Sequence, residues 1–142
     1  MEIEIIPYQG IIVEGKDISL GMKRNEIWEV LGKPISQFKK TYLSEQLTDE
    51  YTGMHVFYNN EDKCVAIEMN DSSSPEFKGS FFFDKKFDEI KRLFVEMGDD
   101  SLEVDDSGLT SIKYGIGIYI PDIEENGNVD GVIVFKKGYY ED

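Results

Sequence analysis

Few side chains in this sequence have the types and spacing that catalysis needs. His55 is the sole histidine, and it stands between Met54 and Val56 without a patterned serine, cysteine or second histidine. Nucleophilic catalysis requires a nucleophile, a base and an orienting group in register, and the sequence offers no such set. Cys64 is the only cysteine, and we interpret it as a small strand residue. The sequence therefore predicts no catalytic residue and no enzyme.

One segment partly matches a metal-binding loop. Residues 126–131, Asn-Gly-Asn-Val-Asp-Gly, fit the first six places of a calcium loop. The twelfth place, which needs a bidentate Glu, holds Lys137, and strand patterns flank the segment. Gly115-Ile116-Gly117 lies within a strand pattern rather than the strand–turn–helix setting of a dinucleotide fingerprint. We expect no metal and no cofactor.

Acidic residues dominate the charge. The chain has 15 Lys and Arg against 29 Asp and Glu, a net charge of −14, whereas a small soluble domain typically carries a magnitude of about 2–8. Such a charge argues against nucleic acid and anionic membranes as partners and favours a basic protein. Solubility alone explains it equally well. Asp99, Asp100, Glu103, Asp105 and Asp106 crowd one segment, which could meet basic side chains or simply be a solvated loop.

Length and cysteine content suggest the class and compartment. At 142 residues the chain is expected to form a single domain, 1–142. No apolar run approaches the ~20 residues of a membrane helix, and no signal peptide is visible. One cysteine cannot form an internal disulfide, so we expect a reducing, cytoplasmic location.

Two helices and several strands must position these residues. Ile27, Val30 and Leu31 form an apolar stripe that ends at Gly32, and they predict a helix near 23–31. A longer apolar face predicts a second helix near 85–97. Strand patterns are present at 2–6, 11–13, 38–42, 46–51, 54–58, 64–69, 110–114, 115–120 and 132–135.

The two halves of the sequence correspond. The first helix stripe precedes the second by 63 residues, and Gly53 precedes Gly115 by 62. This agreement predicts pseudo-repeat units near 15–70 and 77–136. The expected fold class is α+β, with two tandem helix-plus-antiparallel-sheet units sharing one sheet and the helices on one face.

The stretch Gly21-Met22, a helix, then Leu31-Gly32-Lys33-Pro34 resembles the β-lactamase inhibitory protein-like and outer-membrane assembly lipoprotein superfamily. The resemblance implies a compact helix-plus-antiparallel-sheet unit, present twice in the inhibitor itself, and a role in protein binding. Some members are lipoproteins, but Met1-Glu2-Ile3-Glu4 is neither basic nor a long apolar run, so a periplasmic assembly role is not expected.

Alternation along the strands suggests a binding surface. If Ile116, Ile118 and Ile120 face the helices, Phe57 and Tyr119 face the opposite side. Aromatic anchors within an acidic surround suit protein recognition, unless loops or the N-terminal hairpin cover this face. The residues predicted to bind a partner are Tyr51, Phe57, Asp99, Asp100, Asp105, Asp106, Tyr114 and Tyr119.

These observations favour a non-enzymatic protein that binds and inhibits a basic protein. An immunity protein that neutralises a basic bacterial toxin domain is the sharpest version of this hypothesis. The alternatives are a structural or assembly scaffold module, which an anchor or partner domain would favour, and a small-ligand-binding protein, which an apolar cavity between helices and sheet would favour. The sequence leaves the oligomeric state open.

Overall fold

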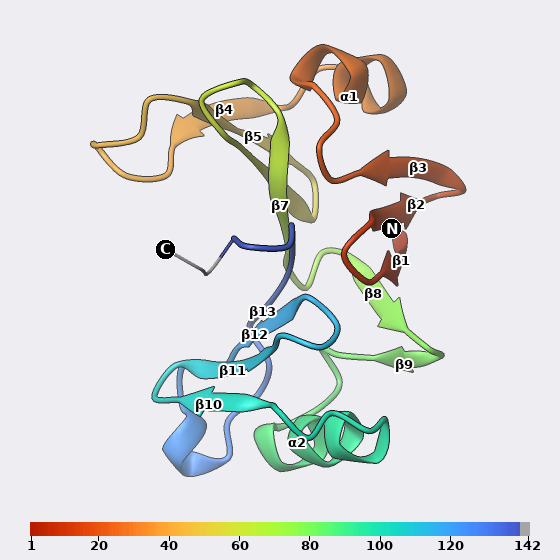
Figure 1. Cartoon of the computed structure of the whole chain (residues 1–142), viewed down its shortest axis with the longest axis vertical. Helices are drawn as coiled ribbons and strands as arrows, with labels where there is room; N and C mark the ends of the chain where they lie inside the picture. Colours follow the sequence, from red (N-terminus) through yellow and green to blue (C-terminus); the bar gives the residue numbers. More distant parts are fainter. Residues whose placement is uncertain (140–142) are drawn as a thin grey trace.

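The computed structural model describes residues 1–139 and is mostly β (Figure 1). In this range thirteen strands form two sheets, with two short α-helices and one 3-10 turn, η1 (Ile123–Glu125). The expected α+β class, with two helix-plus-sheet units sharing one sheet, is therefore wrong. The physical reason is that the N-terminal strands pair with residues 74–81 to form a sheet of their own. The pseudo-repeat units near 15–70 and 77–136 remain a prediction.

The larger sheet has eight strands, and every neighbouring pair is antiparallel. Its order is β10-β11-β12-β13-β7-β6-β5-β4, so the two ends of the sheet each come from consecutive strands and meet at β13 and β7. The strands are β4 (Ser36–Lys39), β5 (Leu47–Tyr51), β6 (Met54–Tyr58), β7 (Cys64–Met69), β10 (Glu103–Asp105), β11 (Gly108–Ser111), β12 (Ile116–Tyr119) and β13 (Gly131–Phe135).

The smaller sheet has five strands in the order β3-β2-β1-β8-β9. β1 and β8 run parallel, with Ile3 opposite Pro75, while the other pairs are antiparallel. A parallel pair needs a long crossover connection, and here the chain builds half of the larger sheet between the two strands. The strands are β1 (Glu2–Ile6), β2 (Gly10–Val13), β3 (Lys16–Ser19), β8 (Ser74–Phe77) and β9 (Ser80–Phe81).

Helix α1 (Arg24–Leu31) confirms the helix predicted near 23–31. Glu26 accepts the backbone N–H of Lys23 at 2.9 Å, which satisfies one of the donors that a helix start leaves free. Gly32 ends the helix at a φ of 83°, a conformation that favours glycine, and donates its N–H to Trp28 at 2.8 Å.

Helix α2 (Phe87–Glu96) confirms the helix predicted near 85–97. Its first turn is held by the segment that partly matched a calcium loop. The N–H of Phe87 donates to the carbonyl of Gly127 at 3.0 Å, and the N–H of Asp88 donates to the Asn126 side chain at 2.9 Å. These residues therefore serve as an external cap of the helix.

The core lies between the two sheets and the two helices. In Figure 1, α1 is at the top, α2 at the bottom and the five-stranded sheet at the right, so that the larger sheet faces them from the left. One apolar cluster includes members of every layer, among them Ile5 of β1, Ile27 of α1, Ile67 of β7, Phe94 of α2 and Ile118 of β12. No helix in residues 1–139 has the length and apolar character to cross a membrane.

Asp49 of β5 fastens α1 to the larger sheet. Its carboxylate is fully buried and accepts four hydrogen bonds. Arg24 and Gln37 donate to one oxygen at 2.7 and 2.8 Å, and Trp28 and Tyr58 donate to the other at 2.8 Å each. The Arg24 guanidinium also lies 3.9 Å from the centre of the Tyr58 ring. A buried carboxylate is tolerated because each oxygen is paired.

We expect Asp49→Ala to lower the free energy of unfolding by about 3–5 kcal/mol, because it removes the only carboxylate that the side chains of Trp28 and Tyr58 donate to and one of the two that pair with Arg24. Asp62→Ala is the matched control. It removes the other carboxylate bound to Arg24, at 2.8 Å, but the Asp62 side chain is 47% exposed, so the cost should stay below about 1 kcal/mol. Urea denaturation of both variants measures the difference, and equal costs would contradict the role of Asp49.

Candidate functional site

The larger sheet has a second face, which points away from the core and which we call the outward face. Strand pairing places Glu68, Ile133, Gly117 and Thr110 on it, because each pairs with the next. Phe57 lies on the same face, because it pairs with Ala66, two residues before Glu68 on β7. The face therefore runs without a break across the pairing of β7 with β13.

A groove of about 730 Å³ lies along this face, which we call the outer groove. Gly117 and Thr110 line it with Ile133, while Phe57 and Tyr119 provide its aromatic surface. Gly117 has no side chain where a strand residue would normally project, and this leaves room between its neighbours. The backbone at Gly117 is extended and has no positive φ, so a residue with a side chain could adopt the same conformation.

Charged groups surround the outer groove unevenly. Glu68, Glu103 and Asp105 contribute carboxylates, and Lys40 is the one basic side chain among the lining residues. The backbone N–H of Ser107 donates a hydrogen bond to the Asp105 carboxylate, and the Ser107 hydroxyl donates a second one. These bonds, the backbone one most of all, hold the pKa of Asp105 below its ordinary value. Asp105 is thus anionic at neutral pH, and the groove favours a positively charged occupant.

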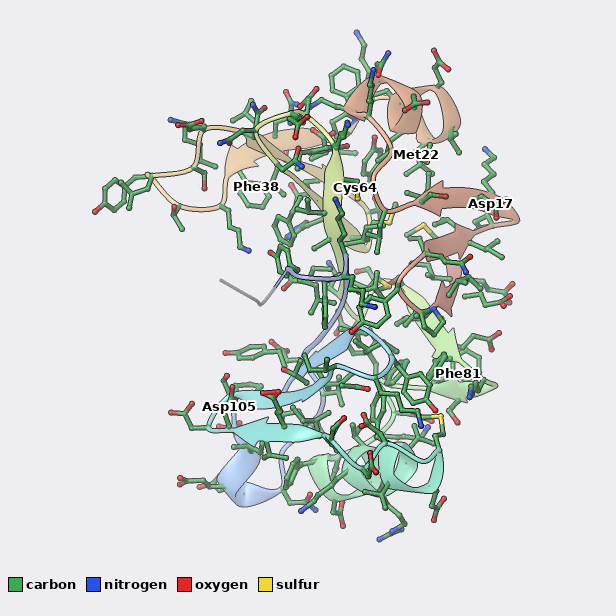
Figure 2. All side chains as sticks on the ribbon, viewed as in Figure 1. Asp17, Met22, Phe38, Cys64, Phe81 and Asp105 are labelled. Atoms are coloured by element: carbon green, nitrogen blue, oxygen red, sulfur yellow. The ribbon has the colours of Figure 1, made fainter. Side chains whose placement is uncertain are left out.

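The lower end of the sheet extends this negative field. Residues 99–130, which we call the acidic arm, hold nine Asp and Glu and a single Lys. Eight of those nine carboxylates are exposed. The turn between β10 and β11 is held beside the end of β12, because the N–H of Ile120 donates to the carbonyl of Ser107 at 2.8 Å. Asp105 lies on this end of the molecule in Figure 2.

Three of the eight predicted residues line the outer groove, and two more are exposed on the acidic arm. Tyr119 is 48% exposed and lines it, as do Asp105 and the largely buried Phe57. Asp100 and Asp106 are exposed on the acidic arm. The prediction that Phe57 and Tyr119 share the face opposite the isoleucines is confirmed.

Part of the outward face is covered, as the sequence analysis allowed for loops or the N-terminal hairpin. Phe57 packs with Phe135, against which Tyr8 of the N-terminal β1–β2 turn and Tyr139 are packed. The Lys40 ammonium lies 4.5 Å from the centre of the Phe57 ring. Tyr119 is therefore the more accessible aromatic anchor.

The other three predicted residues serve the fold. The Tyr51 hydroxyl donates to the carbonyl of Gly32 at 2.8 Å, and the Tyr114 hydroxyl donates to that of Met97 at 2.7 Å, so that each holds a helix end. Asp99 is 2% exposed and accepts hydrogen bonds from Ser111 and Ser101. Burial, helped by the charge of Asp49, raises the pKa of Tyr51 to about 12. These three side chains therefore bond to the fold rather than line the outer groove.

His55 lies on the outward face between two carboxylates. Its Nε2 is 3.5 Å from Glu50 and its Nδ1 is 3.6 Å from Glu68, and Phe38 meets its ring edge-on. This arrangement holds β5, β6 and β7 together rather than activating a nucleophile. Across residues 1–139, no cluster of three or more His, Cys, Asp or Glu side chains is placed to hold a metal ion.

Sequence reasoning missed an exposed apolar segment. The hairpin formed by β4 and β5 carries large apolar side chains in water rather than in the core, and we call residues 35–47 the apolar hairpin. Its five members are Ile35, Phe38, Tyr42, Leu43 and Leu47. Their spacing follows neither a helix nor a strand period, and that irregularity was the available signal.

A second acidic hollow lies on the five-stranded sheet. It has a volume of about 460 Å³ and is lined by Glu2, Glu4, Glu14 and Glu76, with Phe81 as its one aromatic. It is smaller than the outer groove and has fewer apolar anchors.

A scan of protein-family models and searches of curated proteins and of solved structures found no match to the chain.

The burial of the Cys64 thiol can be tested through the pH dependence of stability. Burial raises the pKa of Cys64 from 9.0 to about 12. Between these values the unfolded chain releases the thiol proton while the folded chain keeps it, so stability falls as pH rises. We expect Cys64→Ala to make the decline in unfolding free energy between pH 9 and 12 shallower. Tyr51 keeps its own contribution in the variant, because its pKa is also raised. An unchanged slope would show that the thiol is accessible in the folded protein.

Proposed function

We propose that this protein binds a basic segment of another protein in the outer groove and does so without catalysis. The observation that carries the proposal is that an exposed aromatic anchor, Tyr119, and a surround of carboxylates occur in one groove, to whose apolar lining the largely buried Phe57 adds. Apolar anchors supply most of the binding energy in protein interfaces, and surrounding charge selects the partner and speeds encounter.

The engagement of chemically capable groups within the fold supports binding over catalysis. Cys64 is buried with a raised pKa, Asp49 is paired with four donors, and Asp99 is bonded to two serines. His55 lies between two glutamates. None of these groups is aimed at the outer groove as a nucleophile with its base.

The most specific form of the proposal is an immunity protein that neutralises a basic toxin domain in the cytoplasm. Its support is the net charge of −14 together with the acidic arm, since an inhibitor of a basic domain gains from long-range attraction. A scaffold role would place partners at the sheet edges, and a small-ligand role would use an enclosed cavity. The open, acidic outer groove favours a protein segment over both.

A synthetic peptide of alternating Lys and Trp is a suitable probe for the outer groove. We expect it to bind, and a matched Glu and Trp peptide to fail, in fluorescence anisotropy titrations. Tyr119→Ala should weaken binding about 30-fold, corresponding to about 2 kcal/mol for a buried anchor. Gly117→Leu should also abolish most binding, because its side chain fills the groove.

Val95→Ala is the matched control for these variants, since Val95 is 56% exposed on α2, away from the groove. Melting temperatures near that of the parent protein establish that each variant is folded. Equal affinity of the basic and acidic peptides, or parent-like binding by Gly117→Leu, would contradict the proposed site.

Long-range attraction by the carboxylates should affect the association rate, whereas direct contacts in the groove should affect the dissociation rate. We expect the double variant Asp105→Asn and Asp106→Asn to slow association of the basic peptide at low salt and to differ little from the parent at high salt, because screening removes steering beyond ~8 Å at physiological ionic strength. Stopped-flow mixing at two salt concentrations measures this. A change confined to dissociation would show that these carboxylates act by direct contact instead.

A further inference from the structure

The apolar hairpin is the second unusual surface of the molecule. Among the described residues eleven large hydrophobic side chains are exposed, and five of them lie within residues 35–47. Tyr42 is 88% exposed and Leu43 is 76% exposed, at the tip between β4 and β5. Such a concentration of apolar surface marks an interaction site rather than ordinary scatter.

The charge of the apolar hairpin is opposite to that of the acidic arm. Residues 35–47 contain Lys39 and Lys40 and one acidic residue, Glu45. The acidic arm has nine carboxylates against one lysine. The hairpin is therefore an apolar, aromatic-tipped segment with a net charge of +1. Lys40 already lies over Phe57 of its own chain, so Lys39 is the lysine that can meet the carboxylates of a second copy.

We propose that the outer groove is occupied by the apolar hairpin of a second copy of this chain, in a reciprocal dimer. This inference rests on the proposed function, because it uses the same groove. Tyr42 and Leu43 of each copy pack on Tyr119 and in the space beside Gly117 of the other. Lys39 lies against the carboxylates of the opposite acidic arm.

The shape of the molecule allows both contacts to form together. The apolar hairpin and the β10–β11 hairpin project from the same side of the molecule at opposite ends, as Phe38 and Asp105 show in Figure 2. A two-fold axis perpendicular to this view places the apolar hairpin of each copy opposite the acidic arm of the other. Such an interface is closed and self-complementary, so assembly stops at two copies.

The dimer has a regulatory consequence. A basic partner and the second copy compete for one groove, so that partner binding releases monomers by mass action. The net charge of −14 on each copy opposes self-association. The dimer is therefore weaker than a complex with a basic partner, and it depends on concentration.

Sedimentation velocity at physiological salt over a wide range of concentration tests the dimer. We expect the mass to double as concentration rises in the parent protein and in the Val95→Ala control. The double variant Tyr42→Ser and Leu43→Ser, and separately Gly117→Leu, should remain monomeric. A parent protein that stays monomeric, or variants that dimerise as the parent does, would overturn the inference.

Mixing tests the reciprocity. The double variant Tyr42→Ser and Leu43→Ser, which we call the hairpin variant, keeps an intact groove, and the Gly117→Leu variant keeps an intact hairpin. One of the two contacts can therefore form between these variants. We expect fluorescently labelled hairpin variant to sediment faster when excess Gly117→Leu is added, and not when excess hairpin variant is added. No association in the mixture would refute hairpin-in-groove pairing.

The same hairpin variant separates this inference from the proposed function. Because its groove is intact, it should bind the Lys and Trp peptide as tightly as the parent does. If the peptide binds but the parent protein does not dimerise, the dimer proposal is wrong and the proposed function stands. If the parent dimerises but no protein binds the peptide, the proposed function is wrong and the dimer stands.

Discussion

The pairing of β13 with β7 is the constraint on which the rest of the structure depends. It joins strands that are more than sixty residues apart, with Val132 opposite Met69 and Ile133 opposite Glu68. Without it the larger sheet would be two separate four-stranded pieces, and the outer groove would lose its continuity, since Glu68 and Ile133 line it from opposite sides of this pairing. The same contact brings the apolar hairpin and the acidic arm into one rigid frame, because they occupy the two ends of the joined sheet.

Acidic residues in this chain divide into two kinds by burial. Asp49 and Asp99 are buried and saturated with hydrogen-bond donors, and they fasten elements of the core. The other eight carboxylates of the acidic arm are exposed and leave much of their charge unneutralised. Net charge alone cannot distinguish the two kinds, because pairing depends on which donors the fold brings near. The division shows which carboxylates serve the fold and which can act on a charged partner.

Local signals in the sequence were sufficient for the helices and for one face of the sheet. Gly32 and the stripe containing Ile27 determine where α1 ends and what it buries, and strict alternation places Tyr119 opposite Ile118. The fold class was beyond such signals, because β1 and β8 pair across 72 residues, as in Ile3 with Pro75. Tyr51 and Asp99 were misplaced for a related reason. Each follows a local pattern typical of exposed residues, yet each is turned inward to a partner that only the folded chain supplies, Gly32 for the hydroxyl and Ser111 for the carboxylate.

The central claim is that the outer groove is where this protein meets its partner, and residue-resolved NMR tests it most directly. A titration of isotopically labelled protein with the Lys and Trp peptide should shift the backbone amides of Gly108, Thr110, Gly117, Tyr119 and Ile133, which line the groove. Amides on the five-stranded sheet should stay in place. Shifts concentrated instead at Glu4, Glu76 and Phe81, in the second acidic hollow, would contradict the account.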